Sequence, residues 1–170
     1  VNAINWIDGL DGLAAGITII SSISFLIVHI KSADYGNALI SSLLIGSTTA
    51  FLLFNKYPSK IIMGDSGSYI LGFLLASISL IGNHSFEFGN GGYYQIQEII
   101  IPILILFVPI ADMAYVIFSR ILVSRSPFYP DRRHLHHRLL NEGFKHNDSV
   151  IKIYLLSLPT AFLALWIALT

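Results

Sequence analysis

The sequence has no cysteine and few charged side chains. The absence of cysteine excludes a disulfide framework and a thiolate metal site, so oxygen or nitrogen ligands must hold any metal ion. Such ligands suit a hard cation, and we expect Mg²⁺, with Mn²⁺ as the alternative. Of the 170 residues, 12% are charged and 54% are hydrophobic. This composition, together with the lack of polar helix faces, argues against a soluble domain and indicates an integral membrane protein.

Five apolar stretches meet or nearly meet the length of about 20 residues that a helix needs to cross a bilayer. They span residues 13–30, 38–54, 66–82, 99–119 and 150–169. The third and fourth can also be read as buried core helices, and Pro102 and Pro109 are expected to kink the fourth. We expect an all-α fold, a polytopic transmembrane helical bundle that forms one integral membrane domain over residues 1–170.

Positive charge is unevenly distributed, although the formal net charge is zero. If the first apolar stretch runs outward, nine of the ten Lys and Arg residues lie on the side where it starts, and only Lys31 lies opposite. The positive-inside rule then places residues 1–12, 55–67 and 120–152 in the cytoplasm, with 120–149 as the largest loop. We therefore expect a multi-pass protein of the plasma (inner) membrane, although some of these cations can equally serve as interfacial anchors.

Two segments place polar side chains at the cytoplasmic ends of apolar stretches. Asn5, Asp8 and Asp11 recur every three residues, so on a helix they share one slowly drifting face. Unpaired carboxylates are costly at a membrane boundary, which makes this group a binding-site candidate. In Gly64–Ser68, Asp65 stands where an apolar helix begins, and small residues and the helix dipole suit a metal-bound phosphate there. The alternative, which this segment taken alone favours, is that Asp65 is only an N-cap residue.

A third segment, residues 130–138, concentrates Arg and His side chains, which can bind phosphate oxygens or transfer protons near neutral pH. Its alternatives are a polybasic patch for lipid headgroups and a transition-metal site. Asp112 lies about two turns before the end of the fourth apolar stretch. It is either a residue of the functional site or the partner of an ion pair with Arg120 or Arg138, and the sequence leaves both readings open.

Taken together, Asn2–Gly16, Met63–Gly72 and the histidines of 130–138 resemble the polyprenyl-phosphate N-acetylhexosamine-1-phosphate transferases, relatives of the phospho-MurNAc-pentapeptide translocase. The resemblance implies a Mg²⁺-dependent enzyme that moves a sugar-1-phosphate from a UDP-sugar to undecaprenyl phosphate on the cytoplasmic side. UMP is released, and a cell-envelope glycan is initiated. The His-x-His-His form favours the GlcNAc-1-phosphate branch. Expected partners are a UDP-N-acetylhexosamine, the polyprenyl phosphate lipid and the membrane, with no nucleic acid; a homodimer is left open.

The resemblance also assigns roles to individual residues. Metal binding falls to Asp65 and Asn5. Catalytic roles fall to Asp8, Asp11, His134, His136 and His137. Substrate binding falls to Asn5, Gly9, Leu10, Asp112 and Arg133, with Gly9 and Leu10 beside the uracil. In this hypothesis the histidines and Arg133 neutralise the charge that develops as UMP leaves.

One feature of the resembled family is missing. Its members carry an adjacent acidic pair on an earlier cytoplasmic segment, whereas this sequence has no two neighbouring Asp or Glu residues. The sequence also starts at Val1, directly before a motif residue. We therefore expect the C-terminal part of a larger helical enzyme, inactive on its own. The alternatives are a membrane transporter, suggested by Asp112 and the prolines of the fourth stretch, and a noncatalytic membrane subunit.

Overall fold

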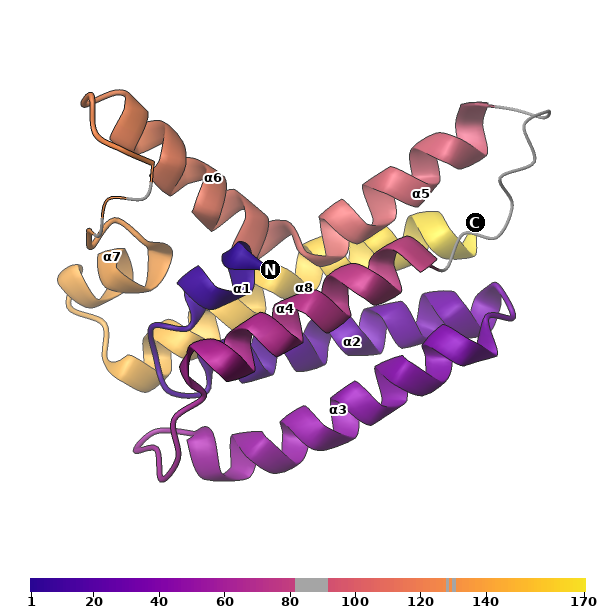
Figure 1. Cartoon of the computed structure of the whole chain (residues 1–170), viewed down its shortest axis with the longest axis horizontal. Coiled ribbons are helices and arrows are strands. Elements are labelled where there is room, and N and C mark those ends of the chain that lie inside the picture. Colours follow the sequence, from indigo (N-terminus) through magenta and orange to yellow (C-terminus); the bar gives the residue numbers. More distant parts are fainter. Residues whose placement is uncertain (82–91, 128, 130) are drawn as a thin grey trace.

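The computed structural model describes residues 1–81, 92–127, 129 and 131–170, and within these ranges the chain forms helices and no strands (Figure 1). This confirms the expected all-α fold. The helices are α1 (Asn2–Ile7), α2 (Leu13–Lys31), α3 (Tyr35–Asn55), α4 (Gly64–Ile81), α5 (Gly92–Ile105), α6 (Phe107–Ile121), α7 (Leu135–Asn141) and α8 (His146–Leu169).

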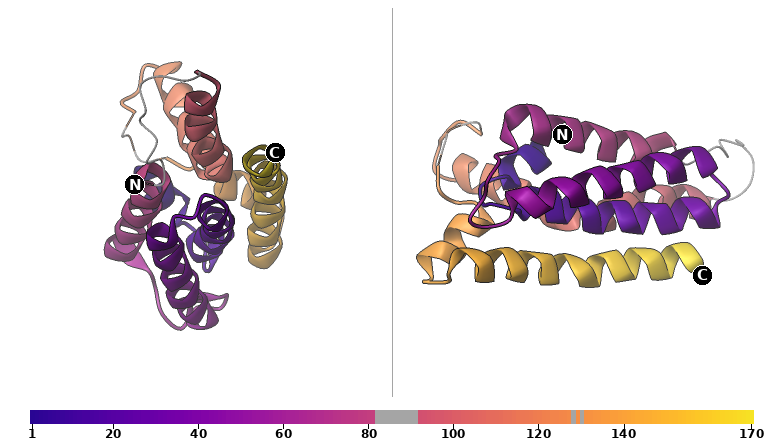
Figure 2. Two further views of the ribbon diagram at one scale, coloured as in Figure 1. Left: turned by 90° about the vertical axis from the view of Figure 1, so that its right-hand side faces the viewer. Right: turned by 90° about the horizontal axis from the view of Figure 1, so that it is seen from below.

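Four long helices, α2, α3, α4 and α8, run side by side and form a bundle (Figures 1 and 2). The central helix is α2, which packs most extensively against α3 and α8. Its Leu13, Ile17 and Phe25 are buried and join Leu75 and Ile78 of α4 in the hydrophobic core. Large apolar side chains remain exposed along α3 and α8, which is typical of helices that face lipid.

Three of the described helices, α2, α3 and α8, are long and apolar enough to cross a membrane. The expected stretches 13–30, 38–54 and 150–169 lie within them. Residues 66–81 of the expected stretch 66–82 fall on α4, an 18-residue helix that begins with a polar turn, and residue 82 lies outside the described residues. A further span is formed by α5 and α6 if the two are counted together, with a bend of 82° between them.

The fourth expected span, 99–119, is broken between α5 and α6. Because Pro109 has no N–H, the carbonyl of Ile105 loses its helical donor, and the Ser21 hydroxyl of α2 donates to that carbonyl at 3.5 Å. Leu106 stands between the two helices with φ −99° and ψ 18°. The kink expected from the prolines is therefore present, and it turns α6 away from the bundle (Figure 1).

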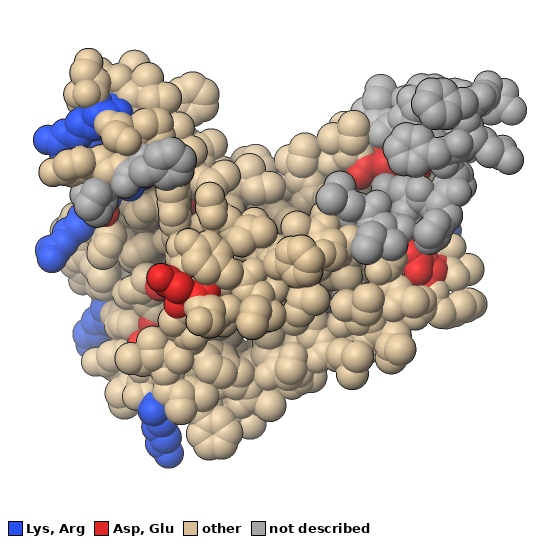
Figure 3. All heavy atoms as spheres, in the orientation of Figure 1, with Lys and Arg blue, Asp and Glu red and all other residues tan. Residues whose placement is uncertain are grey.

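Lys and Arg side chains gather at the end of the molecule where α6 finishes and α7 lies, as Figures 1 and 3 show. The first turns of α2 and α4 lie at the same end. The charge asymmetry read from the sequence is thus also an asymmetry of the folded chain, and it places the three polar segments at one end of an apolar bundle.

Helices α2 and α8 approach each other closely at Gly16. A Cβ atom there would overlap the ring of Tyr154, whose hydroxyl donates a hydrogen bond of 2.5 Å to the carbonyl of Gly12. Gly12 precedes α2 with φ 81°, a left-handed conformation that glycine adopts at little cost. The two glycines therefore allow close helix packing, as small residues commonly do in membranes.

We expect Gly16→Ala to destabilise the protein by about 1–3 kcal/mol, because the added methyl group must displace Tyr154 from a packed interface. Gly46→Ala is the matched control: Gly46 also lies within a helix, α3, and no neighbouring side chain comes within 4 Å of the position that its Cβ would take. Thermal unfolding of both variants in detergent measures the difference. Equal melting temperatures would contradict this account of the interface.

Candidate functional site

The short helix α1 joins the polar segments, because it packs against both α4 and α6 at the charged end of the bundle. Ile4 and Ile7 are buried and anchor α1 in the hydrophobic core. Asn5 contacts α4, and the ring of Trp6 meets the ring of His134 edge-on at a centroid distance of 5.7 Å. Residues that are far apart in the sequence therefore meet around these two side chains.

Asn5 and Asp65, which the resemblance assigns to metal binding, are in direct contact. The amide nitrogen of Asn5 donates hydrogen bonds of 3.0 Å to Oδ1 of Asp65 and to the hydroxyl of Ser68. Asp65 is the second residue of α4, whereas a simple N-cap residue would precede the helix. Its side chain is exposed, so the carboxylate is accessible to a ligand.

Asp8, Asp11 and Asp65 form an acidic cluster. Burial, followed by the negative charges of Asp65 and Asp11, raises the pKa of Asp8 to about 6. A bound cation would relieve this repulsion. Within the described ranges, no three His, Asp or Glu side chains are arranged to enclose a metal ion by themselves. The acidic cluster nevertheless suits Mg²⁺, which proteins commonly hold through one or two carboxylates together with substrate phosphates.

A network of hydrogen bonds fixes the turn that carries Asp11. Its Oδ2 accepts a hydrogen bond of 3.1 Å from the backbone of Ser59. The buried side chain of Asn55 accepts from the N–H of Gly12 at 3.0 Å and donates to the carbonyl of Ile61 at 2.9 Å. These bonds tie the turn after α1 to the loop that leads into α4, and so set the position of Asp11 relative to Asp65. Sequence analysis missed Asn55, whose one signal is an amide at the end of an apolar helix.

Asp112 binds the start of α7. Its Oδ2 lies 2.8 Å from Nδ1 of His134, and its Oδ1 accepts a hydrogen bond of 2.7 Å from the backbone N–H of Leu135. An ionised carboxylate can only accept, so Nδ1 carries the proton and Nε2 of His134 is left for a substrate. Neither ion pair considered for Asp112 is found: Arg120 binds Asp131, and Arg138 lies over the ring of Tyr115.

His136 connects the histidines to the acidic cluster. Its ring covers Gly9, where any Cβ atom would overlap the imidazole. Burial, followed by the charges of His137 and His134, lowers the pKa of His136 to about 4, and burial also lowers the pKa of His137. Both imidazoles are therefore neutral near pH 7 in the free protein. They can exchange hydrogen bonds with a substrate, but they add no positive charge until a bound anion raises their pKa.

Comparison with known proteins shows what this chain is similar to. Residues 1–83 match the model of glycosyl transferase family 4. The chain is 41% identical over 155 residues to the probable undecaprenyl-phosphate N-acetylglucosaminyl 1-phosphate transferase of Bacillus subtilis. It is 40% identical over 167 residues to the decaprenyl-phosphate N-acetylglucosaminephosphotransferase of Mycobacterium leprae. The chain is thus similar to the transferases of glycosyl transferase family 4.

The similarity covers most of this chain but less than half of each relative. The alignments include 91% of the chain in both cases, and 41% and 42% of the Bacillus and Mycobacterium proteins. A phospho-N-acetylmuramoyl-pentapeptide-transferase of Caldanaerobacter subterraneus is 30% identical over 166 residues, which are 98% of the chain and 48% of that protein. The chain thus spans less than half the length of these curated relatives.

Two of the predicted substrate-binding residues have partners that the sequence did not indicate. Leu10 is 9% exposed and belongs to the hydrophobic core. Arg133 donates from Nη1 to the carbonyl of Ser119 at 2.7 Å, and its Nε lies 3.6 Å from Asp131. A third of the Arg133 side chain stays exposed (33%), so donors remain for a substrate. The roles assigned to both residues remain predictions.

We expect His136 to lower the folding stability of this chain as the pH decreases from about 6.5 to about 4. In this window the unfolded chain binds a proton at His136 that the folded chain excludes, because burial holds the folded pKa near 4. Through His136, acid therefore favours the unfolded state, and the effect vanishes above pH 6.5. Asp8, whose pKa is raised to about 6, acts in the opposite sense between about pH 6 and 4. As the pH decreases from 7 to 5, the melting temperature of His136→Asn should rise relative to that of the parent, because only the parent loses stability through His136. Parallel pH dependences would show that His136 does not titrate as described.

Proposed function

We propose that the protein containing this chain transfers GlcNAc-1-phosphate from UDP-GlcNAc to undecaprenyl phosphate, releases UMP, and so initiates a cell-envelope glycan. The observation that carries the proposal is the contact between His136 and Gly9, which joins the acidic cluster to the Asp112–His134 pair. The names of the Bacillus and Mycobacterium relatives, with 41% and 40% identity against 30% for the pentapeptide transferase, support GlcNAc as the sugar.

In the proposed site, Asp65 and the amide oxygen of Asn5 would hold Mg²⁺, with Mn²⁺ as the alternative. When bound there, the ion would supply charge neutralisation for the diphosphate and Lewis-acid polarisation of the phosphorus. Because the amide nitrogen of Asn5 now donates to Asp65, the amide must turn to present its oxygen to the ion. Asp8 and Asp11 orient the nucleotide sugar, and the Gly9 backbone approaches the substrate closely.

The chemical step is a phosphoryl transfer. An oxygen of the lipid phosphate attacks the phosphorus attached to the sugar, a new P–O bond forms, and the bond from that phosphorus to the bridging oxygen breaks, so that UMP leaves with the oxygen. His134, held by Asp112 in one tautomer, points Nε2 at this charge, while Arg133 and His137 donate to phosphate oxygens. Positioning and electrostatics supply most of the rate enhancement in such transfers.

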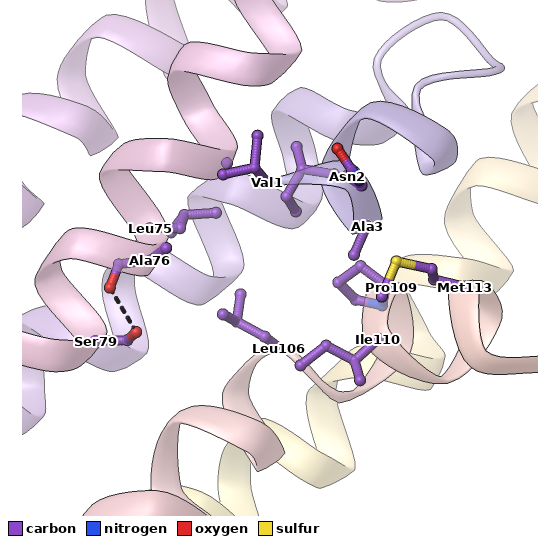
Figure 4. Close-up of a pocket in the computed structure, with 12 residues that line it drawn as sticks. Val1, Asn2, Ala3, Leu75, Ala76, Ser79, Leu106, Pro109, Ile110 and Met113 are labelled. Atoms are coloured by element: carbon purple, nitrogen blue, oxygen red, sulfur yellow. Dashed lines mark hydrogen bonds between the residues drawn. The ribbon is translucent and has the colours of Figure 1, made fainter. Parts of the chain in front are cut away.

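The isoprenoid tail has a place beside this site. An apolar pocket of about 460 Å³ lies between α1, α4 and α6 (Figure 4). Its lining includes Leu75 of α4 and, around the α5–α6 break, Leu106, Pro109, Ile110 and Met113. Since α1 forms one wall and also carries Asn5, one lipid molecule can place its tail in the pocket and its phosphate near the acidic cluster.

The proposed reaction takes place at the cytoplasmic face of the plasma membrane, because the site lies at the end of the bundle where Lys and Arg gather. The same observation argues against a transporter. A transporter needs polar groups along a path through the bilayer, whereas the acidic cluster and the histidines lie at one end of the molecule.

We expect Asp65→Asn to lower Mg²⁺-dependent UMP release from UDP-GlcNAc and undecaprenyl phosphate on the order of 10²-fold or more, because it removes the charge that holds the cation. Asp148→Asn is the matched control: Asp148 is also an exposed carboxylate in the first turn of a helix, α8. The assay uses the full-length protein in membranes or detergent. Equal rates for the two variants would contradict the metal-binding role of Asp65. A folded parent protein that releases no UMP would contradict the transferase proposal.

Metal binding can be measured without turnover. Mg²⁺ should raise the melting temperature of the parent, because a ligand that binds only the folded state stabilises it. In Asp65→Asn this shift should shrink or vanish, while in Asp148→Asn it should persist. A shift of the same size in Asp65→Asn and the parent would place the ion elsewhere.

A further inference from the structure

A buried ion pair lies outside the residues assigned so far to the site. Arg120, near the end of α6, is 3% exposed. Its Nε and Nη2 donate to the two oxygens of Asp131, each at 3.0 Å, and its Nη1 donates to the carbonyl of Pro127. The Asp131 side chain is 9% exposed. Fork geometry of this kind fixes both position and orientation, since two parallel hydrogen bonds must be kept together.

Asp131 also shapes the backbone just before the histidines. Its Oδ1 accepts a hydrogen bond of 3.2 Å from the N–H of Arg133, two residues further on. Arg133 in turn donates to the carbonyl of Ser119. The chain that leaves α6 is thus tied back to the end of α6, and His134 follows directly after this tie. The backbone path that delivers His134 to Asp112 depends on these contacts.

The same arginine reaches α1. The guanidinium carbon of Arg120 lies 5.2 Å from the ring centroid of Trp6, and the same ring meets His134 edge-on. Trp6 is the neighbour of Asn5, which binds Asp65. Arg120 therefore touches the chain on both sides of the proposed site: the segment that carries the histidines and the helix that carries Asn5.

We propose that Arg120 and Asp131 are positioning residues of the transferase site, which set the distance between the histidines and the acidic cluster. The expected effect on turnover rests on the proposed function. The geometric part of the inference rests on the contacts of Trp6. Neither residue binds substrate in this account, because the charges of both are directed at each other and shielded from solvent.

A purely structural ion pair and a positioning pair differ in one respect. Removing one partner of a buried pair strands the other charge and destabilises the fold, whereas neutralising both removes the stranded charge. If the pair only stabilised the protein, the double neutral variant would recover stability and turnover together. If the pair positions the histidines, stability should return without turnover.

The experiment compares Arg120→Met, Asp131→Asn and the double variant in the full-length protein, with Arg125→Met as the control. Arg125 lies on the same connection, is exposed, and stacks on Tyr129 outside the site. Both single variants should melt below the parent, and the double variant should recover most of that loss. UMP release by the double variant should keep a kcat at least tenfold below the parent, with KM for UDP-GlcNAc within about threefold. A kcat within threefold of the parent would overturn the proposal.

A conservative variant keeps the test decisive if the double variant does not fold. Arg120→Lys retains the charge opposite Asp131 but lacks the fork of donors that binds Asp131 and Pro127 together. We expect it to fold with a kcat at least threefold below the parent. A folded Arg120→Lys protein with the turnover of the parent would overturn the proposal.

A spectroscopic measurement separates this inference from the proposed function. In a full-length background in which Trp166, the second tryptophan of this chain, and any tryptophan outside the chain are replaced by phenylalanine, the emission reports on Trp6 alone. Arg120→Met and Asp131→Asn should change the emission of Trp6, and Arg125→Met should not. If the parent releases no UMP, the proposed function fails, and this emission still decides the inference: unchanged emission in Asp131→Asn would show that the pair does not set the surroundings of Trp6.

Discussion

The two hydrogen bonds accepted by Asp112 hold the site together. The chain bends by 82° between α5 and α6, and α6 points away from the bundle. The segment that follows α6 must therefore return, and Asp112 fixes where it ends by binding His134 and the N–H of Leu135. Leu135 opens α7, so one carboxylate both satisfies a free helix N–H and orients an imidazole. Hydrogen bonds to charged groups contribute about 1.5–3 kcal/mol each, which is enough to select one placement of a seven-residue helix.

The bundle could be predicted because lipid imposes a simple requirement on sequence. A span needs a long apolar run, and such runs located α2, α3 and α8 directly. The prolines predicted a kink in the fourth stretch but not its angle. Proline removes a hydrogen bond, while the direction of the bend depends on neighbours such as the Ser21 hydroxyl, which binds the freed carbonyl of Ile105. That contact joins residues 84 positions apart, and no local pattern encodes it.

The sequence offered candidate members of the site, whereas the contacts between them come from the structure. The contact between Asn5 and Asp65 agrees with the assignment of both to one site. The partner of Asp112 could not be chosen from sequence, because Arg120 and His134 are both near enough in the chain and both can bind a carboxylate. The structure excludes Arg120 as the partner of Asp112, because Arg120 forms an ion pair with Asp131. Likewise, the neutral state of His136 follows from burial, which residue type and spacing do not reveal.

The charges around the proposed site act at two ranges. Exposed arginines such as Arg132 and Arg138 surround it and create a positive field that attracts anionic substrates from a distance. Close to the reacting atoms the local charge is negative instead, because the acidic cluster is partly buried there and His136 is neutral. A diphosphate entering this inner region without a cation would meet net repulsion. The proposed reaction therefore favours a diphosphate that arrives together with its divalent cation, since the acidic cluster then gains a counter-charge at the same moment as the substrate is bound.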